Sequence, residues 1–112
     1  MIIMKRALYL VLKSGTLAFN VLEGLKREGF NATLISTESL KHAIDDFPED
    51  HHFYNLRHFE EKQNQESILG LFVAEADKIE YIKALVRKFT NNFKDVHGFM
   101  YSVNIEDYEG SI

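Results

Sequence analysis

Two short segments of the chain, residues 6–12 and 67–74, are apolar at nearly every position. Runs of this length are typical of strands that carry apolar side chains on both faces. After each run the pattern changes, and apolar residues recur every three or four positions. That spacing predicts an amphipathic helix. A strand followed by a helix is therefore predicted twice, and this restricts the chain to folds in which helices pack on a sheet.

The first predicted helix carries an apolar stripe and has a residue suited to each end. Thr16 is the expected N-cap, and Gly29 stands where a left-handed residue commonly ends a helix. The stripe consists of Ala18, Val21, Leu22 and Leu25. We expect about three helical turns that bury this stripe.

The second predicted helix begins near Asp77. Glu80 follows three residues later, a spacing that predicts a capping box at the start of the helix. The apolar stripe consists of Ile79, Ile82, Leu85, Val86 and Phe89. These residues predict the buried face of the helix.

Two further strands complete the pattern. Residues 31–37 are rich in β-branched side chains, and residues 99–105 alternate between two faces. The order is strand, helix, strand, a long insertion at 38–66, then strand, helix, strand. This order predicts an α+β, ferredoxin-like βαββαβ sandwich, with both helices on one face of a four-stranded sheet. Residues 1–112 are expected to form a single domain.

The other face of such a sheet has no helix to cover it. Because the first and third strands are apolar on both faces, a monomer would expose a large apolar patch. We therefore expect the chain to self-associate, with sheets from two or three subunits packed face to face.

Composition narrows the class of protein. The chain has 112 residues, 46% of them hydrophobic, no cysteine, and a formal net charge of −4. The missing cysteines exclude disulfides, thiolate metal sites and a cysteine nucleophile. No apolar run reaches the roughly 18 residues of a membrane span, so we expect a cytoplasmic protein. Interleaved acidic and basic residues argue against nucleic acid as the main partner.

The insertion at 38–66 is the expected place for function, because long connections in compact domains are usually binding loops or lids. It contains His42, His51, His52 and His58 together with several acidic residues. Imidazole and carboxylate groups bind zinc and other transition metals. A metal-binding module that uses His51, His52 and His58 is therefore the alternative hypothesis, although the histidine spacing favours solvated side chains over a dedicated site.

The sequence contains no pattern that predicts catalysis. It lacks a Gly-x-Ser-x-Gly elbow, a His-Glu-x-x-His pair and a complete phosphate-binding loop. The segment 13–16 (KSGT) is a weak anion site at most, and a plain turn is the favoured interpretation. We therefore predict a protein that is not an enzyme and has no cofactor. A small dimeric ferredoxin-like enzyme is the third hypothesis, and it requires a deep pocket with a polarised His or carboxylate between the helices and the sheet.

Three segments are similar to PII-like signalling proteins, and to their cyclic-di-AMP receptor branch in particular. They are residues 29–37 (GFNATLIST), residues 68–73 (ILGLFV) with the following 77–82 (DKIEYI), and residues 98–103 (GFMYSV). The resemblance covers most of the chain outside the insertion. It differs at Asn31, where that branch has arginine, and residues 91–98 lack the phosphate loop of the nitrogen-regulatory members.

The resemblance implies a homotrimer that binds a small effector, commonly a nucleotide, in clefts between subunits. It also implies that the long loop changes shape and signals to a downstream protein. The corresponding ligand-binding positions are Asn31, Thr33 and Thr37, and we add Arg57 from the insertion. The identity of the effector stays open.

Overall fold

The structure is a computed structural model, and it describes residues 4–37 and 67–111. The elements follow the predicted order. They are β1 (Lys5–Lys13), α1 (Thr16–Arg27), β2 (Thr33–Thr37), β3 (Ser67–Glu75), α4 (Ala76–Thr90) and β4 (Gly98–Ile105). The prediction of an α+β protein built from two strand-helix-strand halves is confirmed.

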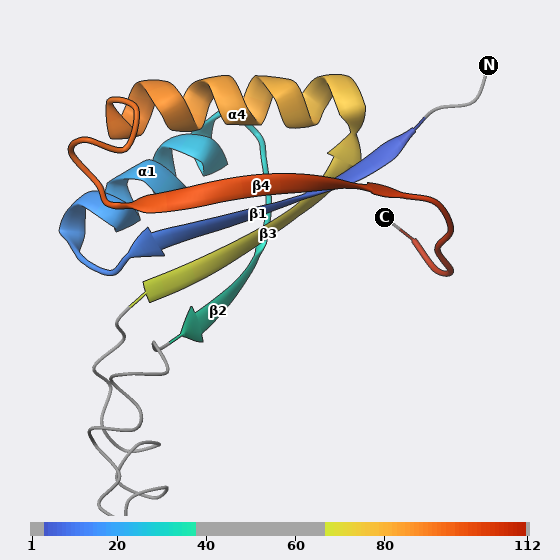
Figure 1. The fold of residues 1–112 in the computed structure, drawn as a ribbon, viewed down its shortest axis with the longest axis horizontal. Coiled ribbons are helices and arrows are strands. Elements are labelled where there is room, and N and C mark those ends of the chain that lie inside the picture. The colour runs from blue at the N-terminus through green and yellow to red at the C-terminus, as the bar shows by residue number, and fades with distance from the viewer. Residues whose placement is uncertain (1–3, 38–66, 112) are drawn as a thin grey trace, which may run out of the picture.

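The four strands form one sheet in the order β2-β3-β1-β4, and each pair of neighbours is antiparallel. Each helix therefore connects two parallel strands that are not neighbours in the sheet. Figure 1 shows α1 and α4 on the same side of the sheet. This arrangement is compatible with a ferredoxin-like sandwich.

The core lies between the sheet and the two helices. Alternate residues of β1, Leu8, Leu10 and Leu12, are fully buried there, and Phe72 of β3 lies beside them. The helices contribute the buried residues Ala18, Val21, Leu25, Ile79, Ile82, Leu85 and Val86. The predicted stripes of both helices are therefore confirmed, apart from Leu22 of α1 and Phe89 of α4, which are only half-buried.

The predicted N-terminal caps of the helices are wrong. Gly15 is the N-cap of α1, so Thr16 lies inside the first turn and its side chain makes no capping bond. Glu75 is the N-cap of α4, and Asp77 Oδ1 accepts a hydrogen bond from the Lys78 N–H (2.9 Å) instead of forming a capping box. The cap position depends on where the backbone first adopts helical angles, and residue spacing does not specify that point to within a residue.

The sheet face away from α1 and α4, here called the open face, is apolar and aromatic. Tyr9 and Tyr101 are partners in adjacent strands, and their rings stack with centroids 4.9 Å apart. Phe99 and Tyr101 are 56% and 51% exposed. In the part of the chain that the structure describes, no helix packs on this face, and the expected uncovered apolar face is therefore present.

Neither helix of the described segments is long and apolar enough to cross a membrane.

Candidate functional site

The backbone turns from α1 into β2 at a C-terminal capping motif of the helix. Gly29 has a positive φ of 93°, and its N–H donates to the Lys26 carbonyl (2.9 Å). The Phe30 N–H donates to the Leu25 carbonyl (3.1 Å). These two bonds form a Schellman motif, which requires a left-handed residue at its centre. The predicted role of Gly29 is confirmed, and the motif directs Phe30 and Asn31 toward the start of β2.

The structure separates the predicted ligand-binding residues onto two sides of β2. Thr33 pairs with Leu71, and Leu71 pairs with Tyr9, so Thr33 belongs to the open face. Thr37 is four residues along the same strand and therefore shares this face. Asn31 precedes β2 and borders a groove on the helix side, where its Oδ1 accepts a hydrogen bond from the Ala32 N–H (2.9 Å). Thr33 and Thr37 thus lie together, and Asn31 lies apart from them.

Two residues that the sequence did not associate with Thr37 lie beside it. Thr37 pairs with Ser67 of β3, and Ser67 pairs with Lys13 of β1. The three residues form a polar row across the open face, next to the two ends of the segment 38–66. Hydroxyl and ammonium groups donate hydrogen bonds to anionic oxygens, so this row is suited to a phosphate or carboxylate group. Only the strand register reveals Lys13 and Ser67 as neighbours, because the KSGT segment marks Lys13 alone and no local motif marks Ser67.

The remaining predicted site residues lie outside the described residues. These are Arg57 and the proposed metal ligands His51, His52 and His58. Residues 4–37 and 67–111 contain no group of three or more His, Asp or Glu side chains that could hold a metal ion. The metal-binding hypothesis therefore stays a prediction about the segment 38–66.

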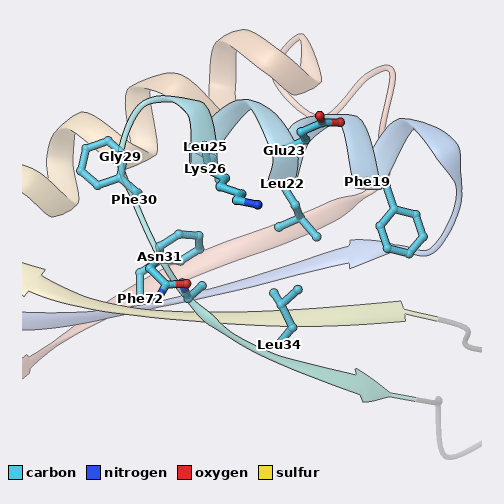
Figure 2. Close-up of a pocket in the computed structure, with 11 residues that line it drawn as sticks. Phe19, Leu22, Glu23, Leu25, Lys26, Gly29, Phe30, Asn31, Leu34 and Phe72 are labelled. Carbon is cyan, nitrogen blue, oxygen red and sulfur yellow. The ribbon is translucent and has the colours of Figure 1, made fainter.

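A second candidate site is the groove between α1 and β2 (Figure 2). Its volume is about 620 Å³, which is within the usual range for small-molecule sites. Apolar side chains form most of its surface. They include Phe19, Leu22, Phe30, Leu34 and Phe72. This groove lies on the side of β2 opposite to Thr33 and Thr37.

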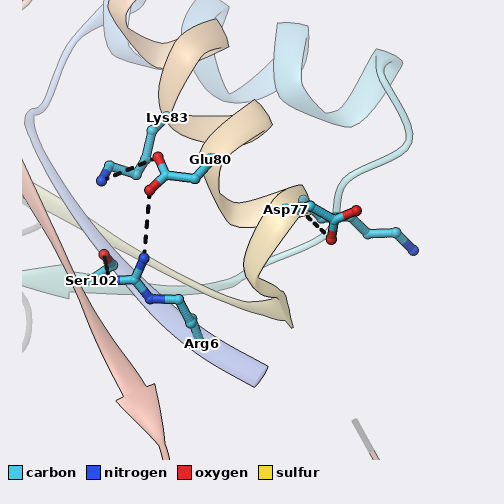
Figure 3. Close-up of polar contacts among 6 residues, drawn as sticks. Arg6, Asp77, Glu80, Lys83 and Ser102 are labelled. Carbon is cyan, nitrogen blue, oxygen red and sulfur yellow. Dashed lines mark hydrogen bonds and ion pairs between the residues drawn. The ribbon is translucent and has the colours of Figure 1, made fainter. Parts of the chain in front are cut away.

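A cluster of charged residues ties the sheet to α4 (Figure 3). Arg6 Nη2 donates to Ser102 Oγ (2.7 Å), and Arg6 Nη1 lies 3.5 Å from Glu80 Oε1. The other carboxylate oxygen of Glu80 lies 3.5 Å from Lys83 Nζ. The cluster joins β1, β4 and α4, so we assign it a structural role.

The turn at 13–16 precedes α1 and borders a smaller hollow of about 230 Å³. Asp95 and His97 line the same hollow. A carboxylate beside a helix N-terminus competes with any bound anion, because both interact favourably with the positive end of the helix dipole. The expected plain turn is the better description of this segment.

No protein-family model and no curated protein matches the chain.

Proposed function

We propose that this chain is a PII-like regulatory protein that assembles as a homotrimer and binds a small, nucleotide-like effector between subunits. The effector would contact Thr33, Thr37 and the segment 38–66, which would transmit the signal to a downstream protein. The observation that carries the proposal is the composition of the open face. An apolar, aromatic surface suited to self-association continues into a polar row beside the ends of the segment 38–66.

The apolar part of the open face supports the assembly. A row of paired residues crosses the whole sheet at its centre, from Thr33 through Leu71 and Tyr9 to Tyr101. Soluble monomers rarely expose continuous apolar patches of this kind. Packing against further copies would remove these side chains from water and would stabilise the oligomer in proportion to the apolar area buried.

The polar row supports an anionic effector. Lys13 supplies a positive charge, while Thr37 and Ser67 supply hydroxyl groups, and all three lie at the margin of the apolar surface. A ligand at this margin would contact two subunits at once if the apolar surfaces pack together. Its binding would then be coupled to assembly.

Two measurements test the proposal. Light scattering at micromolar concentration should give three times the 13.0 kDa mass of the chain. ATP, ADP and cyclic-di-AMP should be screened by thermal shift, and an effector at a hundred times its Kd stabilises the folded state by about 2.7 kcal/mol. A monomeric mass would contradict the assembly, and the absence of any stabilising nucleotide would contradict the effector class.

The site itself is tested by variants of β2. The double variant Thr33→Val/Thr37→Val keeps the strand propensity and removes both hydroxyl groups, so it should lose most of the nucleotide-induced stabilisation. Ser36→Ala is the matched control, because Ser36 lies on the other face of the same strand. Equal stabilisation of both variants would place the effector elsewhere.

A further inference from the structure

The groove between α1 and β2 forms where α1 leaves part of the edge strand β2 uncovered. α1 buries Ala18, Val21 and Leu25 against the sheet. Leu34 on β2 faces the same side but is 52% exposed, and Phe19 on α1 is 55% exposed. Both side chains line the groove, with Phe72 as part of its floor. The groove therefore presents apolar surface to solvent at a hollow of ligand size.

Three polar side chains line this groove, those of Glu23, Lys26 and Asn31. Figure 2 shows the Lys26 side chain extending from α1 into the space between the helix and β2. Glu23 also lines the groove, and its carboxylate is paired with Arg27 Nη2 (3.1 Å), which offsets its negative charge. Asn31 Oδ1 already accepts from the Ala32 N–H, so its amide NH2 is the group left to bind a ligand. An ammonium group and an amide donor complement a carboxylate.

We propose that this groove binds an apolar monocarboxylate, a molecule with an aliphatic body and a single anionic end. The aliphatic body lies on Leu22, Leu34 and Phe72. The carboxylate accepts hydrogen bonds from Lys26 Nζ and the Asn31 amide. A nucleotide is a poor fit, because its several phosphate charges and polar sugar would meet an apolar surface.

This site is independent of the effector site proposed above. The groove is on the helix side of β2, whereas Thr33 and Thr37 are on the open face. A ligand in the groove contacts residues of one subunit. Its binding therefore does not require the trimer, and either proposal can fail without the other.

Calorimetry with decanoate on the full chain tests the inference. We expect saturable binding of one decanoate per chain, about tenfold weaker for Lys26→Gln because a charge-assisted hydrogen bond is lost. Lys88→Gln is the matched control, since Lys88 is an exposed lysine of α4 outside the groove, and it should bind like the wild type. Acetate, which lacks the aliphatic body, and decyltrimethylammonium, which reverses the charge, should not bind.

Several outcomes would overturn the inference. One is the absence of saturable decanoate binding, and another is equal affinity of the wild type and Lys26→Gln. A third is that Val103→Lys, on the open face, weakens binding while Lys26→Gln does not, which would assign the ligand to the open face. A fourth is that Leu34→Asp lowers the oligomer mass while decanoate binding is unchanged, which would assign the groove to a second copy of the chain.

Discussion

At the scale of single residues, Gly98 is the described glycine with the least room for a side chain, because β4 begins there directly beside β1. A Cβ atom built on Gly98 would overlap the Val11 carbonyl oxygen and lie 3.0 Å from the Leu12 Cα. Both are backbone atoms of a central strand and cannot move without disturbing the sheet. We expect Gly98→Ala to lower the free energy of unfolding by about 3 kcal/mol, measured by urea denaturation. Gly110→Ala is the control: a Cβ there meets nothing within 4 Å, so only its positive φ of 98° should cost stability, by about 1 kcal/mol. Equal losses would contradict this explanation.

Thr90 is the one buried polar side chain among the described residues. Its Oγ1 donates to the Val86 carbonyl (2.7 Å) and accepts from the Phe93 N–H (3.0 Å). The second bond fixes an unusual turn in which Asn91, Asn92 and Phe93 all have positive φ. Left-handed angles are unfavourable for residues other than glycine, so the turn depends on such contacts.

Thr90→Val keeps the shape of the side chain and removes both hydrogen bonds. Because the Phe93 N–H then loses its partner, we expect the free energy of unfolding to fall by about 1–3 kcal/mol in chemical denaturation. Thr16→Val is the matched control, since Thr16 is exposed and makes no capping bond, and it should change stability by less than about 0.5 kcal/mol. A Thr90→Val variant as stable as the control would show that the turn is held by other contacts.

At the scale of helices and strands, the sequence predicted the type and order of every described element. It succeeded because the apolar pattern is strong in most elements, from the unbroken run of β1 to the stripe of α4, and because β2 is rich in β-branched residues. It was less accurate at the ends, where Thr16 and Asp77 have the right chemistry for caps but lie one and two residues inside their helices. Likewise, β2 begins at Thr33 and not at Asn31, because the Schellman motif at Gly29 takes up the intervening residues.

Substitutions at the C-terminal ends of the two helices should change the stability of the protein in opposite directions. α1 ends with Gly29 at a φ of 93°, whereas α4 ends with Asn91 at a φ of 53°. Gly29→Ala should cost about 1 kcal/mol, because an L side chain is strained at this angle. Asn91→Gly should be neutral or should stabilise the protein by a few tenths of a kcal/mol, because glycine adopts the left-handed region freely. Thermal and urea unfolding of both variants check the two signs, and a stabilising Gly29→Ala would contradict the assigned ending.

At the scale of the whole molecule, the candidate site was predictable only in part. Thr33 and Thr37, which the resemblance indicated, share one face because they are an even number of residues apart in β2, whereas Asn31 precedes the strand and borders the groove. The association of Thr37 with Ser67 and Lys13 depends on the register of three strands, two of which are separated by the segment 38–66. The groove beside Lys26 depends on how far α1 covers β2, and neither composition nor periodicity carries that information.

The open face also determines how the thermal stability of this protein should depend on its concentration. If copies pack through Tyr9, Tyr101 and their neighbours, the folded state is a complex and mass action stabilises it as concentration rises. We expect the Tm to increase by about 4 °C for each tenfold increase in concentration. Tyr101→Lys puts a charge into this surface beside Tyr9, so the variant should be monomeric with a Tm independent of concentration. Tyr108→Lys is the matched control, because Tyr108 is equally exposed but follows β4, and it should behave like the wild type. If the Tm of the wild type did not change with concentration, the open face would have to be covered from within the chain, and the assembly through this face would be wrong.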